Sequence, residues 1–110
     1  MSGIPLLGGM RTAIANVHLD GDANVVYQSN DGFSDTLTVN GTGDFTHTLS
    51  HNIATAKQCI VATLVGSGGF PSGFISYTQV SDSQIQIKVY DAGGSPSDGA
   101  GYSIMVAQKQ

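Results

Sequence analysis

The segment 83–90 constrains the fold of this chain most, because its polar and apolar side chains alternate without a break. A β-strand has a side-chain period of two, so such a segment can bury one face in a core and leave the other face in water. Its apolar face carries Ile85, Ile87 and Val89. The chain has no Glu and only 4 Lys and Arg residues, so it contains little that a solvated helix would use. We therefore expect an all-β domain.

Turn signals divide the rest of the chain into further strand candidates at about ten-residue spacing. Asn40-Gly41, for example, lies between two apolar-rich segments and is typical of a two-residue hairpin turn. Short strands separated by such turn residues predict an antiparallel β-sandwich, jelly-roll-like, of seven or eight strands. The expected strands are residues 12–19, 23–28, 35–40, 44–50, 58–65, 73–80, 83–90 and 101–108.

The apolar faces of these strands predict the core. The segment 58–65 is apolar on both faces, so we expect a central strand in which Cys59 behaves as a small hydrophobe. Residues 52–57 offer a single helical turn, and we expect a loop there. The predicted core residues are Leu37, Val39, Phe45, Leu49, Ile60, Leu64, Ile85, Ile87, Val89, Ile104 and Val106.

Residues 1–10 differ from the rest of the chain, and we expect them to form an arm ahead of a sandwich domain at 11–110. Gly and Pro residues interrupt this stretch and prevent regular structure, yet four of its side chains are apolar. These candidate assembly contacts are Ile4, Leu6, Leu7 and Met10. They either dock onto a neighbouring subunit or a larger shell, or fold back over the open end of their own sandwich.

Composition narrows the classes of function. Hydrophobic residues make up 40% of the chain, which is not a disordered composition, but charged residues make up only 11%, about half the usual share. We expect part of the surface to meet another protein or to be covered by Ser, Thr, Asn and Gln. The net charge of −4 and the lack of a Lys/Arg cluster argue against nucleic-acid binding. No apolar run is long enough for membrane insertion, and the first residues lack the pattern of a secretory signal.

Motifs for metal binding are incomplete. The segment Asp20–Asn24 places oxygen ligands at the first spacings of a calcium loop, and Asp31 falls at its twelfth position. The loop then fails, because Val25 occupies the position that requires Gly and the final Glu is missing. We interpret the segment as an Asp-rich hairpin turn and expect no metal site.

No constellation for catalysis is recognisable either. His47 and His51 share a strand face but would lie about 13 Å apart along a regular strand, too far to bind one metal ion within a subunit. We expect them to be satisfied interior or interface residues. Neither has a matched nucleophile, and elbow, phosphate-loop and paired-cysteine motifs are absent. We expect no enzyme, no catalytic residues and no cofactor. Phe70, in the Gly-rich loop 66–73, is a candidate loop-tip contact that caps the sandwich or projects to a partner.

Four segments carry a family resemblance. Asn40–Leu49 resembles the G-x-G-x-[YF]-x-[VI]-x-[FL] strand of small β-sandwich modules in bacteriophage tail fibres and related virion proteins. Ala56–Val61, Ser81–Val89 and Tyr102–Val106 match later strands of the same modules. His47 departs from the pattern, because the modules usually have an aliphatic residue there.

The resemblance covers about residues 25–108 and implies a homo-oligomer, most often a trimer. Since no shaft sequence precedes the module, we expect a decoration or cement protein on the capsid surface, in contact with the major capsid protein. The alternative is a tail-fibre-type receptor-binding module that contacts a host surface receptor or glycan. Either way the protein is expected in the virion, after synthesis in the host cytoplasm.

Removal of the arm tests its role. We expect a truncated chain that starts at Arg11 to stay folded but to lose association with particles, because burying one such apolar side chain contributes roughly 1.5–3 kcal/mol. Circular dichroism checks folding and co-sedimentation with particles checks association. Binding as tight as that of the full chain would show that the arm is not the anchor.

Overall fold

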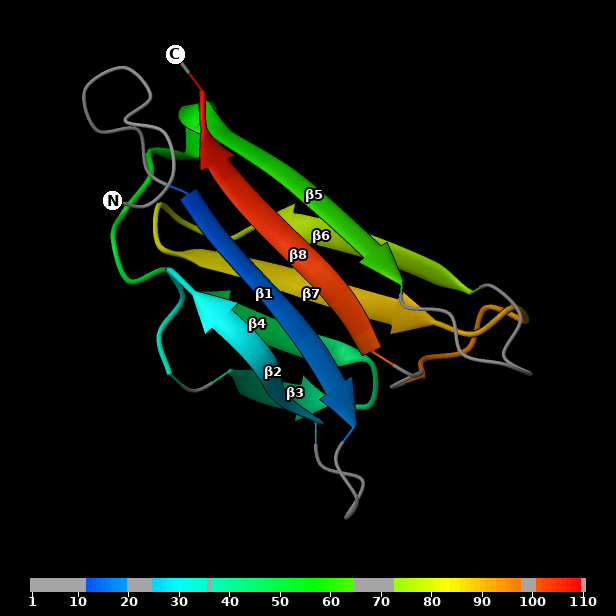
Figure 1. Cartoon of the computed structure of the whole chain (residues 1–110). Helices are drawn as coiled ribbons and strands as arrows, with labels where there is room; N and C mark the ends of the chain where they lie inside the picture. The colour runs from blue at the N-terminus through cyan, green and yellow to red at the C-terminus, as the bar shows by residue number, and fades with distance from the viewer. Residues whose placement is uncertain (1–11, 20–24, 36, 65–72, 98–100, 110) are drawn as a thin grey trace.

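Alternating segments of the sequence form eight strands in the computed structural model, which describes residues 12–19, 25–35, 37–64, 73–97 and 101–109. The strands lie in two layers that pack face to face (Figure 1). They are β1 (Thr12–Leu19), β2 (Val25–Asp31), β3 (Thr38–Gly41), β4 (Asp44–Thr48), β5 (Gln58–Leu64), β6 (Phe74–Gln79), β7 (Gln84–Tyr90) and β8 (Gly101–Gln108). One short 3-10 helix, η1 (Thr55–Lys57), precedes β5.

The strands divide into a first sheet of order β2-β1-β8-β5 and a second sheet of order β3-β4-β7-β6. All pairs in both sheets are antiparallel. Strands β1 and β2, β3 and β4, and β6 and β7 pair as neighbours within a sheet, while the other connections cross between sheets. Eight antiparallel strands split evenly between two packed sheets form a β-sandwich. The predicted antiparallel β-sandwich is therefore confirmed.

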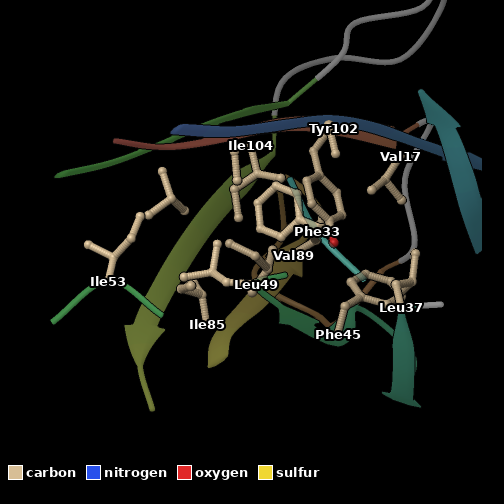
Figure 2. Close-up of a cluster of buried hydrophobic side chains, with 14 residues drawn as sticks. Val17, Phe33, Leu37, Phe45, Leu49, Ile53, Ile85, Val89, Tyr102 and Ile104 are labelled. Carbon is tan, nitrogen blue, oxygen red and sulfur yellow. The ribbon is translucent and has the colours of Figure 1, made fainter. Parts of the chain in front are cut away.

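Inward-facing residues of both sheets form one core (Figure 2). The register places Phe45 of β4 beside Ile87 of β7, and Ala15 of β1 beside Ile104 of β8. Most of the predicted core is confirmed as buried, with Ile60 and Leu64 packed at its margin. The buried apolar residues are Ala13, Ala15, Val17, Phe33, Leu37, Phe45, Leu49, Ile53, Ile85, Ile87, Val89, Tyr102, Ile104 and Val106.

Two core predictions are wrong because the residues lie on edge strands. Val39 pairs with Phe45, but β3 ends its sheet and leaves the Val39 side chain 52% exposed. Strand β5 is not central either, since it pairs only with β8. Its outward face reaches solvent, so Cys59 is exposed instead of buried.

A short bridge joins the two sheets at one end. Phe33, just after β2, pairs with Leu49, just after β4. The Ser34 N–H donates to the Thr48 carbonyl over 2.7 Å. The chain passes so close to β1 here that a Cβ on Gly32, whose φ is +102°, would lie 2.8 Å from backbone atoms of β1. Glycine is the residue that this approach and this φ favour.

Core packing predicts that substitutions of Phe45 and of its neighbour Val39 differ sharply in their effect on the free energy of unfolding. Phe45→Ala leaves a cavity between the sheets and should lower the free energy of unfolding by about 3–5 kcal/mol. Val39→Ala removes a half-exposed side chain on the same ladder and should lower it by less than about 1 kcal/mol. Urea unfolding measures both values. Equal losses would contradict this assignment of the core.

Candidate functional site

The residues predicted as assembly contacts lie outside the described part of the chain. This applies to Ile4, Leu6, Leu7 and Met10 of the arm, and to Phe70 of the Gly-rich loop. The Asp-rich segment 20–24 lies outside it as well. These assignments stay predictions. Among the described residues, no group of three or more His, Cys and Asp side chains is placed to hold a metal ion.

Within the described residues, His47 is completely buried between the sheets, and so is the Tyr102 side chain beside it. Its Nδ1 lies 2.7 Å from the Tyr27 hydroxyl oxygen, and its Nε2 lies 2.5 Å from the Tyr102 hydroxyl oxygen. The two tyrosines come from β2 and β8 of the first sheet, whereas His47 belongs to β4 of the second. The imidazole therefore links the two layers by side-chain hydrogen bonds.

Aromatic rings enclose this link. The His47 ring lies 5.4 Å from the Phe33 ring and 5.5 Å from the Tyr102 ring, which it meets edge to face. Such arrangements favour compact packing of the rings. Both nitrogens of His47 are engaged, so neither is free to serve as a base or a metal ligand. The prediction of a satisfied interior histidine is confirmed for His47, whereas His51 lies exposed beyond the end of β4.

Burial keeps this cluster neutral. Burial lowers the pKa of His47 to about 4. It also raises the pKa of Tyr27 and of Tyr102 above their usual range, and for Tyr102 the neighbouring Tyr27 adds to the increase. A neutral imidazole has one N–H, so one tyrosine hydroxyl donates to the bare nitrogen and the other accepts from the N–H. At neutral pH the cluster is a structural clamp between the sheets.

The outer face of the first sheet is apolar at its centre. The register aligns Ile14 of β1, Met105 of β8 and Val61 of β5 in one row across three strands. Ile14 is 51% exposed and Val61 is 48% exposed. We call this row, with the rows on either side of it on β1, β8 and β5, the uncharged face; its border on β2 is charged, because Asp31 pairs with Ile14. The flanking rows are Thr12, Ala107 and Cys59 on one side and Asn16, Ser103 and Thr63 on the other.

Over β3, β4 and the middle of β7, the outer face of the second sheet is polar. Gln86 Nε2 donates to Asp44 Oδ1 over 2.8 Å, and Asn40 Nδ2 donates to the same oxygen over 3.2 Å. These two hydrogen bonds, that from Gln86 first, lower the pKa of Asp44. Asn40 also donates to the Thr46 hydroxyl over 2.9 Å. This coat of Thr, Asn and Gln agrees with the low charge content of the chain.

Sequence reasoning missed Ile14 and Val61 as surface residues. The missed signal is in the alternation itself: Ala13, Ala15 and Val17 take the inward positions of β1, which forces Ile14 outward. In β5 the apolar outward positions suggested a central strand, although an apolar outer face produces the same pattern.

Comparisons with known proteins yield no match among family models, curated proteins or solved structures. Within the described ranges, no helix has the length and apolar character needed to cross a membrane. The resemblance to phage virion modules therefore stays a prediction.

Acid should weaken the clamp at His47. The folded-state pKa of about 4 lies below the ordinary value of 6.5, so the unfolded chain takes up a proton first as the pH falls. Stability from this group is complete above pH 6.5 and declines toward pH 4, by at most about 3 kcal/mol. Denaturant unfolding at intervals through this range measures the decline.

The matched controls are His47→Gln, which cannot titrate, and His51→Gln, which removes an exposed histidine. We expect His47→Gln to flatten the pH dependence of the free energy of unfolding between pH 6.5 and 4.5. We expect His51→Gln to leave that pH dependence unchanged. An unchanged slope in His47→Gln would rule out His47 as its source.

Proposed function

We propose that this chain is a non-enzymatic structural protein of a bacteriophage virion, which binds to the capsid surface as a decoration or cement protein. The observation that carries the proposal is the uncharged face, with its row of Ile14, Met105 and Val61 across three strands. Exposed apolar surface framed by polar residues is typical of a protein–protein contact. A capsid shell offers a partner for such a face on every subunit.

The interior of the domain supports a structural role. His47, the buried ionisable group, is neutral and fully engaged with Tyr27 and Tyr102. An interior of this kind stabilises a rigid unit and leaves interaction to the surfaces. The homotrimer follows from the resemblance to virion modules, and we include it in the proposal as the assembly state that docks onto the shell, next to the major capsid protein.

Add-back to particles that lack the protein tests the proposal. We expect such particles to be fragile toward heat or chelation, and purified protein to bind them and restore resistance. Val61→Lys, which places a charge on the uncharged face, should weaken binding by about tenfold or more, because burying an unpaired charge is costly. Thr38→Lys, at an exposed position on the edge strand β3, is the matched control and should bind normally.

Adsorption assays distinguish the alternative role, a receptor-binding module, from the role of a decoration protein. If the particles keep their resistance but fail to adsorb to host cells, the protein acts as a receptor-binding module and the decoration proposal is wrong. Equal binding by Val61→Lys and Thr38→Lys would show that the uncharged face is not the docking surface.

A further inference from the structure

Among the described residues, strand β6 is an unpaired edge of the second sheet. It pairs only with β7, in a regular register from Phe74 opposite Tyr90 to Gln79 opposite Ile85. Edge strands in natural proteins usually carry charges, proline or bulges that prevent pairing with another chain. The edge strands β2 and β3 each contain a register shift. Strand β6, with the sequence Phe-Ile-Ser-Tyr-Thr-Gln, has none of these devices.

The main-chain groups that point away from β7 can be assigned. The Val80 N–H donates to the Gln84 carbonyl over 3.0 Å, which makes this pair a hydrogen-bonded one. Hydrogen-bonded and non-hydrogen-bonded pairs alternate along an antiparallel ladder. It follows that Phe74, Ser76 and Thr78 direct their N–H and C=O groups toward β7. The N–H and C=O groups of Ile75, Tyr77 and Gln79 are directed toward the open edge.

Exposed apolar side chains are concentrated on β6 and on Val80, the residue that follows it. Phe74 is 59% exposed, Tyr77 48% and Val80 51%. They are spaced evenly, three residues apart, with Tyr77 at the midpoint. An antiparallel pairing of β6 with itself about a two-fold axis at Tyr77 therefore sets Phe74 of each copy opposite Val80 of the other, and Tyr77 opposite Tyr77.

The same axis also pairs the main-chain N–H and C=O groups that face the open edge. It places Ile75 of one copy opposite Gln79 of the other, so every residue whose main-chain groups face the open edge meets another such residue. No charged side chain lies within β6, so two copies of an acidic chain bring no like charges together along this edge. The strand is also held in place, because the Gln79 side chain donates to the Thr55 carbonyl over 2.9 Å and to Gln58 over 3.1 Å.

We propose that two copies of this chain pair through β6, antiparallel about a two-fold axis at Tyr77, and join their second sheets into one continuous sheet. The occupant of the edge is a second copy, because one axis matches both the main-chain groups and the three exposed apolar side chains. A two-fold contact of this kind is isologous and joins subunits in pairs. The contact area is small, so we expect a dissociation constant of roughly micromolar order.

Sedimentation of the full chain over a wide concentration range tests the pairing. We expect reversible association into even-numbered species. Tyr77→Lys should raise the dissociation constant at least tenfold. Val39→Lys, which adds the same charge to a similarly exposed apolar position on the edge strand β3, should leave it unchanged. Circular dichroism confirms that both variants are folded.

Cysteine cross-linking tests the pairing of two β6 strands even if Tyr77→Lys fails to fold. In a Cys59→Ser background, Tyr77→Cys places two thiols across the axis at a separation of about 5.5 Å between Cα atoms, within disulfide range. We expect mild oxidation to link Tyr77→Cys into dimers at least tenfold faster than Val39→Cys. Equal rates would overturn the pairing, and so would a full chain that sediments only as a monomer or only as an isolated trimer. Shell binding is read separately, so either proposal can fail without the other.

Discussion

The contact on which the rest of the structure depends is the clamp of His47 between Tyr27 and Tyr102. A buried polar group must be hydrogen-bonded, or its desolvation cost is not recovered. His47 meets that requirement only when β2 and β8 of the first sheet lie directly over β4 of the second. The clamp therefore selects one alignment of the two sheets from the many that apolar packing alone would allow.

The filling of the core also determines part of the surface. Ala13, Ala15 and Val17 occupy the inward positions of β1. Because a strand alternates, the intervening Ile14 has to face outward. The apolar row on the uncharged face is in this sense a consequence of which residues of β1 fill the core.

The strands were predictable from the sequence because each depends on local alternation and nearby turn residues, as in β7. At the β3–β4 hairpin the turn itself lies at Thr42 and Gly43, two residues after the expected Asn40-Gly41, which belongs to β3. Neighbour relations were not predictable to the same degree. Val39 has the same pattern as a core residue and is exposed because β3 is the edge strand of its sheet. The partners of His47 lie 20 and 55 residues away in the chain, so no local pattern identifies them. The apolar spacing along β6 indicates a pairing surface only once β6 is known to be an edge strand.

The two proposed contacts use different sheets, and this separation matters for assembly. The uncharged face belongs to β1, β8 and β5, while the pairing edge belongs to β6 of the second sheet. A subunit docked on a shell by the first sheet would keep its β6 edge available. Docking also confines subunits to a surface, which raises their effective concentration and allows a contact that is weak in solution to form. A shell-bound layer joined by β6 pairs would then be more stable than single subunits, without any additional binding surface.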